Sequence, residues 1–211
     1  MIRIAICDDH KIVREGLKSI VSVFPDFDVI ADLESGEALL KWLHKDQPDV
    51  IILDVSLPGR SGLEVLKQIK QIYPDVKVLV LSMYPEDQYA IRTLKAGASG
   101  YLHKDSQPEI LVDALRVIAK GGEYLSPVIT SLLFQEVNQK GGAMPHTALS
   151  DREYEVMLYI GEGKSISEIA NQLSLSVKTV STYRSRILDK MNMGNNSDLV
   201  KYIILHDLEM Q

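Results

Sequence analysis

The sequence contains one cysteine, Cys7, and no long apolar run. A single cysteine excludes an intrachain disulfide, and with only five scattered histidines a structural zinc site is disfavoured. No stretch approaches the roughly 20 apolar residues that cross a bilayer, and the N-terminal residues lack a signal-peptide pattern. We therefore expect a cytoplasmic protein in a reducing compartment, with no membrane partner.

Positive charge is also scarce, since the net charge is −6. This balance argues against a general nucleic-acid binder, but the charge is unevenly distributed. Residues 176–191 carry four basic side chains (Lys178, Arg184, Arg186 and Lys190) against the single acid Asp189. A local basic helix in an acidic protein is typical of a DNA binder that depends on geometry as well as on bulk electrostatics.

The length of 211 residues suits two small domains. Residues 1–120 alternate between strand-like and helical patterns, which predicts an α/β domain with a five-stranded parallel sheet covered on both faces. The predicted strands are 2–7, 27–33, 50–54, 77–82 and 100–103, and the predicted helices are 11–23, 36–45, 62–73, 86–96 and 107–120. No GxGxxG motif follows the first strand, so a dinucleotide-binding unit is disfavoured.

Residues 121–147 have the composition of a linker, with a short helix predicted from Pro127 to about Asn138. Residues 148–211 lose the strand patterns. Four helices are predicted there, at 151–161, 165–173, 177–191 and 196–207. We therefore expect a second, all-α domain of four helices.

Reactive side chains follow four of the five predicted strands. Asp8 and Asp9 follow the first, Asp54 ends the third, Ser82 ends the fourth, and Lys104 follows the fifth. Ligands of open parallel sheets bind outside the carboxyl ends of the strands, so we expect these groups to lie together. Three crowded carboxylates repel one another, and Mg²⁺ is the hard cation that accepts such oxygen ligands.

A softer metal at this edge is disfavoured, because Cys7 is expected to point into the sheet and His10 to begin the next helix. With Mg²⁺ bound, one carboxylate can act as a nucleophile toward phosphorus. Lys104 then supplies a fixed positive charge, and Ser82 a hydrogen bond to a phosphoryl oxygen.

The combined pattern resembles the receiver domain of two-component response regulators. It consists of the Asp-Asp pair, D-x-x-x-P-x-x-x-G at 54–62, Ser82, and Y-x-x-K at 101–104. The resemblance covers residues 1–120 and implies a flavodoxin-like (βα)5 fold.

The same resemblance implies a role for each site residue. Asp54 is expected to accept a phosphoryl group from a histidine kinase. Asp8, Asp9, Asp54 and the carbonyl of Ser56 are expected to hold Mg²⁺, while Ser82 and Tyr101 form a switch in which the hydroxyl moves toward the phosphoryl group and the aromatic ring turns inward. For Tyr101 alone, a half-buried strand tyrosine is the alternative.

Two enzyme interpretations are weaker. Haloacid-dehalogenase-type phosphatases need a second Asp two residues after the nucleophile, where this chain has Ser56. The stretch GEGKS at 161–165 imitates the end of a P-loop, but Leu158 stands where the first glycine is required. We interpret it as a turn, with Ser165 and Glu168 forming a capping box. No enzymatic activity is expected.

Residues 166–191 predict a helix-turn-helix. A short helix has Ile169, Ala170 and Leu173 on its apolar side, a turn follows at 174–175, and Ser176 is a good N-cap for the next helix. In this motif the second helix enters the DNA major groove.

Helical periodicity divides that second helix into two faces. Val177, Val180, Ile187, Leu188 and Met191 are predicted to face the core. The outward face is small, hydroxyl-bearing and basic, and its predicted DNA-contacting residues are Lys178, Thr179, Ser181, Thr182, Ser185 and Arg186, with Asp189 beside them. Arg184 falls among the apolar positions, and the pattern leaves open whether it pairs with Glu153 or Glu168 or extends into solvent.

Residues 148–207 resemble the LuxR-type DNA-binding domain, and the whole chain resembles the NarL/FixJ class of response regulators. This resemblance implies a transcription factor that binds operator DNA as a phosphorylation-dependent homodimer, with a sensor histidine kinase and RNA polymerase as further partners. In the last helix, Leu199, Tyr202 and Ile203 either line a dimer contact or complete the four-helix core. The rival hypothesis is a receiver that acts without phosphate, as a dimerisation or docking module.

Overall fold

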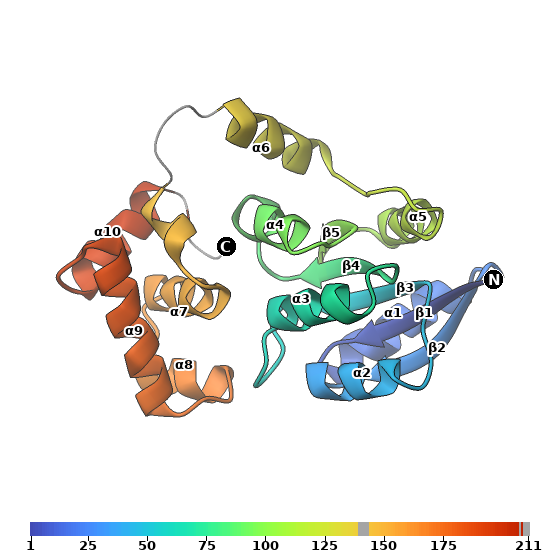
Figure 1. The fold of residues 1–211 in the computed structure, drawn as a ribbon, viewed down its shortest axis with the longest axis horizontal. Helices are drawn as coiled ribbons and strands as arrows, with labels where there is room; N and C mark the ends of the chain where they lie inside the picture. Colours follow the sequence, from blue (N-terminus) through green and yellow to red (C-terminus); the bar gives the residue numbers. More distant parts are fainter. Residues whose placement is uncertain (139–143, 207, 209–211) are drawn as a thin grey trace. The chain divides into compact units, whose positions relative to one another are not determined.

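The computed structural model describes residues 1–138, 144–206 and 208 and divides the chain into two compact units, Met1–Val137 and Asn138–Gln211. Parts of three predicted segments lie outside the described residues: 139–143 of the linker, 207 of the last helix, and 209–211 at the end of the second domain. Figure 1 shows the two units as an α/β fold and a group of helices.

The first unit contains a five-stranded sheet in which every pairing is parallel. Its strands run in the order β2-β1-β3-β4-β5, which is the flavodoxin-like order. Their bounds are Ile2–Cys7 for β1, Phe27–Leu33 for β2, Val50–Asp54 for β3, Lys77–Ser82 for β4 and Gly100–His103 for β5. The predicted parallel sheet is therefore confirmed.

Helices cover both faces of this sheet, as the continuous apolar runs of the central strands require. Their bounds are Lys11–Ser22 for α1, Gly36–Leu43 for α2, Gly62–Ile72 for α3, Glu86–Lys95 for α4 and Pro108–Ala119 for α5. α1 and α5 share one core with the strands, in which Leu17 and Leu115 pack near Ile6 and Ile52. The other face carries α2, α3 and α4 (Figure 1).

Strand order fixes where a site can form. The sheet reverses its direction of growth between the neighbouring strands β1 and β3, and a crevice opens at the carboxyl ends of such a pair. Asp8 and Asp9 follow β1 and Asp54 ends β3, so all three stand at this switch point.

Gly62 allows the chain to turn back beside Asp54. A Cβ at this position would lie 1.9 Å from the Asp54 carbonyl oxygen and 2.7 Å from the Val55 Cα. The Gly62 amide also donates to the Val55 carbonyl at 2.9 Å. The glycine that closes the motif at 54–62 is therefore required by this close backbone approach.

The segment after α5 is attached to β5. Tyr124 forms a bridge with Gly100, and its amide donates to the Ser99 carbonyl at 2.9 Å. Ser126 hydrogen-bonds the Glu86 carboxylate at the start of α4. A helix, α6, then spans Pro127–Asn138.

Within its described residues the second unit contains four α-helices, as predicted, preceded by a 3-10 turn that the sequence did not suggest. Their bounds are Pro145–Ala148 for the turn η1, Asp151–Gly161 for α7, Ile166–Gln172 for α8, Val177–Met191 for α9 and Asn196–Leu205 for α10. Ser165 and Glu168 form the predicted capping box of α8, and Ser176 caps α9 by accepting from the Thr179 amide. Of the helices within the described residues, none has both the length and the apolar character needed to cross a bilayer.

Candidate functional site

The carboxyl ends of three strands bring Asp8, Asp54 and Lys104 into direct contact. Lys104 Nζ lies 2.7 Å from Asp8 Oδ2 and 2.8 Å from Asp54 Oδ2. The exposed fractions of these side chains are 9% for Lys104, 3% for Asp8 and 1% for Asp54. The sheet edge therefore buries two carboxylates against one ammonium group.

Burial governs the charges of this group. It raises the pKa of Asp54, and the neighbouring Asp8 adds to the rise while Lys104 opposes it. Burial also lowers the pKa of Lys104, but Asp54 and Asp8 outweigh this effect and the pKa is raised. Lys104 thus stays cationic, and further positive charge at this edge would stabilise the ionised form of Asp54.

Backbone contacts hold the carboxylates in place. The Ser56 amide donates to Asp54 Oδ1 at 3.1 Å, and the His10 amide donates to Asp8 Oδ1 at 2.8 Å. Arg14, on α1, donates to the Asp8 carbonyl at 2.7 Å. The loop after β1 and the turn after β3 therefore position one carboxylate each.

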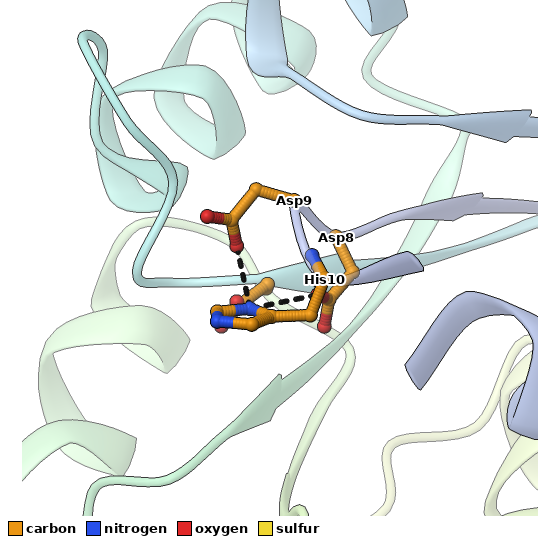
Figure 2. Close-up of side chains that lie close together, drawn as sticks. Asp8, Asp9 and His10 are labelled. Carbon is orange, nitrogen blue, oxygen red and sulfur yellow. Dashed lines mark hydrogen bonds and ion pairs between the residues drawn. The ribbon is translucent and has the colours of Figure 1, made fainter. Parts of the chain in front are cut away.

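Asp9 and His10 extend the acidic edge (Figure 2). His10 Nδ1 lies 2.8 Å from Asp9 Oδ1 and 3.4 Å from Asp8 Oδ1. Asp9 Oδ1 is shielded from solvent and, among the described residues, has no partner in hydrogen-bond geometry, although His10 Nδ1 lies close to it. His10 begins α1 as its N-cap, as predicted. This position does not keep its ring away from the acids, although that was the reason for disfavouring a softer metal at this edge.

This arrangement fits a divalent cation. One ligand atom each from Asp8, Asp9, His10 and Asp54 can be chosen so that all four lie within 4.8 Å of one another. Carboxylate oxygens at this separation, one of them buried and without a hydrogen bond, are the donors that a hard ion such as Mg²⁺ takes.

Ser82 and Tyr101 are both fully buried and meet at the backbone of Tyr84. The Tyr84 amide donates to Ser82 Oγ at 3.0 Å, and the Tyr101 hydroxyl donates to the Tyr84 carbonyl at 2.5 Å. Burial raises the pKa of Tyr101 and outweighs the lowering by Ser82, so the hydroxyl keeps its proton. The ring is fully buried and not half-buried, and the role of Tyr101 as a switch stays a prediction.

The second unit presents one face of α9 to solvent. Lys178, Ser181, Thr182, Ser185 and Arg186 are exposed, and Thr179 is partly exposed. No ion pair involves Lys178 or Arg186 within the described residues, so both cations are available to an anionic partner.

Val177 differs from the prediction. It was expected in the core, but 51% of it is exposed, whereas Val180, Ile187, Leu188 and Met191 are buried. Helical periodicity gives the direction of a side chain but not the point along the helix where the neighbouring helices end. Val177 is the first residue of α9, so we attribute its exposure to its position at the end of the helix.

Arg184 pairs with neither Glu153 nor Glu168, the two acids considered for it. Its Nε donates to Asn196 Oδ1 at 2.6 Å, which links α9 to α10. Glu153 instead pairs with Lys190, whose Nζ lies 2.6 Å from Glu153 Oε2 and links α9 to α7. These contacts fix α9 from its inner side.

The alternatives for α10 are resolved for two residues. Leu199 and Ile203 are fully buried and complete the helical core, so they are not available to a dimer contact. Tyr202 is partly exposed, and its hydroxyl lies 2.7 Å from His146 Nδ1. The exposed apolar residues of α10 are Ile204 and Leu205.

Comparison with known proteins identifies both units. Residues 4–116 match the family described as "Response regulator receiver domain", and residues 147–203 match "Bacterial regulatory proteins, luxR family". The chain belongs to the NarL/FixJ family of two-component response regulators. Its architecture is therefore a receiver domain followed by a LuxR-type DNA-binding domain, in a family of transcriptional regulators.

Individual relatives match over almost the whole chain. The transcriptional regulatory protein DegU of Brevibacillus brevis is 39% identical over 94% of this chain and 91% of its own. The response regulator UvrY of Escherichia coli strain K12 is 34% identical over 99% and 96%. Among solved structures, RcsB of Salmonella enterica serovar Typhimurium, bound to promoter rprA in the presence of phosphomimetic BeF3−, is 26% identical over 95% and 97%, with a TM-score of 0.65.

Proposed function

We propose that Asp54 is the phosphoacceptor through which a sensor histidine kinase controls DNA binding by this response regulator. The contact of Lys104 with both Asp54 and Asp8 at the carboxyl edge of the sheet carries this proposal. It unites a buried carboxylate, a second acid and a fixed cation at the switch point of the fold, where ligands of such sheets bind.

The chemical step is attack by a carboxylate oxygen of Asp54 on the phosphorus of a phosphohistidine. A P–O bond forms, the P–N bond breaks, and the leaving imidazole nitrogen keeps the electron pair and takes up a proton from water. Lys104 offsets the negative charge on the transferring group, and Ser82 donates a hydrogen bond to one of its oxygens.

Asp8, Asp9, Asp54 and the Ser56 carbonyl are the residues that would hold Mg²⁺. The acidic cluster supports this assignment for the three aspartates. When bound, the ion supplies the positive charge that lets three carboxylates and a phosphoryl group share one site.

Phosphorylation would act through Tyr84. A phosphoryl group adds a charge of roughly −1.5 to −2 at Asp54 and draws Ser82 toward its oxygens. Before phosphorylation, Ser82 Oγ accepts a hydrogen bond from the Tyr84 amide, and the Tyr84 carbonyl accepts one from the Tyr101 hydroxyl. Loss of the first bond would release the loop between β4 and α4, and the population would shift toward a homodimer that binds operator DNA.

DNA would be bound by the exposed face of α9 in the major groove. Lys178 and Arg186 are proposed to contact phosphates, and Thr179, Ser181, Thr182 and Ser185 to approach the base edges. RcsB was solved bound to promoter DNA in the presence of a phosphate mimic, and this supports DNA binding by the phosphorylated form here. RNA polymerase is the further partner of the DNA-bound dimer.

Sedimentation and DNA binding, measured before and after treatment with an acyl phosphate and Mg²⁺, test the proposal. Treated protein is expected to dimerise and to bind operator-like DNA more tightly, while treated Asp54→Asn protein should show neither response. A wild-type protein that is modified at Asp54 yet changes neither its mass in solution nor its affinity for DNA would favour the phosphate-independent alternative.

A further inference from the structure

His10 stands at the acidic edge, but phosphoryl transfer gives its imidazole no role. Its Nδ1 faces two carboxylates, at 2.8 Å from Asp9 and 3.4 Å from Asp8 (Figure 2). His10 is the N-cap of α1, yet its side chain makes no capping hydrogen bond. The ring therefore lies against the acids and leaves the helix end uncapped by a side chain.

The backbone of His10 is fixed while its ring has room to move. The His10 amide donates to Asp8 Oδ1 at 2.8 Å, and the His10 carbonyl accepts from the Arg14 amide at 3.1 Å, so the loop and the first turn of α1 hold the residue in place. The side chain is 65% exposed. A small rotation of the ring can therefore adjust Nδ1 without disturbing the core.

The four donors suit one ion. The chosen atoms of Asp8, Asp9, His10 and Asp54 lie within 4.8 Å of one another. Opposite ligands of an octahedral ion with bonds of about 2.1 Å are separated by about 4.2 Å, so only small movements are needed. Asp9 Oδ1, buried and without a hydrogen bond, is the oxygen closest to the imidazole.

The two kinds of donor favour different cations. Mg²⁺ takes carboxylate, carbonyl and water oxygens and gains little from an imidazole. First-row transition cations such as Co²⁺, Ni²⁺ and Zn²⁺ bind imidazole nitrogen well, and mixed nitrogen and oxygen sites favour them over Mg²⁺.

We propose that His10 is a metal-selectivity residue of the receiver site. A first-row transition cation binds the carboxylates of Asp8, Asp9 and Asp54 together with His10 Nδ1, whereas Mg²⁺ binds through oxygens alone. The inference rests on the proposed function in that both use the same acidic site. It adds a second class of ligand, for which the site has higher affinity than for Mg²⁺.

Calorimetric titration of the full chain with Co²⁺ and, separately, with Mg²⁺ tests this assignment. His10→Ala is expected to weaken Co²⁺ binding by about tenfold or more, because even the loss of a residue that only supports the ligands typically costs about 10- to 100-fold in affinity. Its Mg²⁺ affinity should stay within about twofold of wild type, since Mg²⁺ takes oxygen ligands. His44→Ala is the matched control, because His44 contacts Tyr73 away from the acids and should leave both affinities unchanged.

The visible absorption of bound Co²⁺ gives an independent readout of nitrogen ligation. The wild-type spectrum is expected to change in His10→Ala, while Asp9→Asn weakens the binding of both metals. An equal loss of Co²⁺ and Mg²⁺ affinity in His10→Ala, or no loss of either, would overturn the assignment.

Failure of this inference is distinguishable from failure of the proposed function. Modification of Asp54 by an acyl phosphate with Mg²⁺ does not require His10, so His10→Ala should still be modified. If wild-type protein with Mg²⁺ is not modified, the phosphoacceptor proposal fails whatever the cobalt titrations show.

Discussion

The two candidate sites of this protein are built in opposite ways. The receiver edge gathers Asp8, Asp54 and Lys104 from the ends of three strands, and it buries all three against one another. The face of α9 is formed by neighbouring residues of one helix, and its cations Lys178 and Arg186 are exposed.

This difference predicts how each site responds to change. Buried charges depend strongly on their partners, because removing one leaves another unpaired in a medium of low dielectric constant. Exposed phosphate contacts contribute smaller amounts that depend on salt and add together. Single substitutions should therefore have large effects on the receiver edge and small, graded effects on α9.

Lys104→Met should have the largest effect. It removes the cation between Asp8 and Asp54, so the free energy of unfolding should fall by about 3–5 kcal/mol without metal. Mg²⁺ should restore part of the loss, because it neutralises the same carboxylates. Urea unfolding of the full chain with and without Mg²⁺ measures both effects.

Lys18→Met is the matched control for that comparison. Lys18 also contacts two carboxylates, those of Glu15 and Asp32, but on the surface of the same domain. The decrease in the free energy of unfolding should be much smaller in Lys18→Met and should not depend on Mg²⁺. Equal losses in the two variants would contradict the distinction between buried and exposed charge.

Gly62→Ala should have the next largest effect. The added Cβ would meet the Asp54 carbonyl oxygen, so the turn after β3 must shift, at a cost of about 3 kcal/mol. Gly16→Ala is the control, because no atom lies within 4 Å of the added Cβ and alanine is the better helix former. Unfolding measurements that find Gly62→Ala as well tolerated as Gly16→Ala would refute the close approach.

Glu153→Gln isolates the ion pair that links α7 to α9, since glutamine can keep the capping box. Burial raises the pKa of Glu153, but Lys190 and Ser150 lower it more, so it lies below its usual value. A carboxyl with a lowered pKa adds stability above its unfolded pKa and loses it as the pH falls through the folded pKa. The variant should therefore be about 1 kcal/mol less stable than wild type at neutral pH.

The difference in the free energy of unfolding between Glu153→Gln and wild type should narrow as the pH falls below about 4.5, and unfolding curves across that range measure it. A gap that stays constant with pH would show that the charge of Glu153 is not its cause. Glu168→Gln, in the capping box of α8, is the control and should show a smaller change.

Lys178→Ala should have the smallest effect. Removing one phosphate contact should weaken DNA binding uniformly across sequences and reduce the slope of log affinity against log salt by about 1. Lys41→Ala, an exposed cation of α2, should leave both quantities unchanged. Fluorescence anisotropy at several salt concentrations measures the slope, and an unaltered slope in Lys178→Ala would remove this residue from the DNA contacts.

The sequence predicted the sheet, the strand ends and the helix-turn-helix because each depends on local pattern. Asp54 could be placed at the sheet edge because a buried apolar run ends at it. The position of Lys104 at the same edge as Asp8 also followed, since parallel strands end together, but their direct contact is known only from the structure.

Other features depend on side-chain direction or on the extent of a neighbouring element, which periodicity does not contain. The ring of His10 turns toward Asp9, although its position suggested only a helix start. Val177 is exposed although it was predicted in the core. Arg184 donates to the side-chain oxygen of Asn196 and not to either of the acids considered for it. Tyr101 finds its acceptor in the backbone carbonyl of Tyr84, which no side-chain pattern reveals.

Peptide mass spectrometry after treatment with an acyl phosphate and Mg²⁺ tests the central assignment most directly. One phosphoryl group is expected on the peptide that carries Asp54, and none on that peptide in Asp54→Asn protein or when Mg²⁺ is chelated. A phosphoryl group on another residue of the wild-type chain, or an unmodified Asp54 under these conditions, would contradict the account.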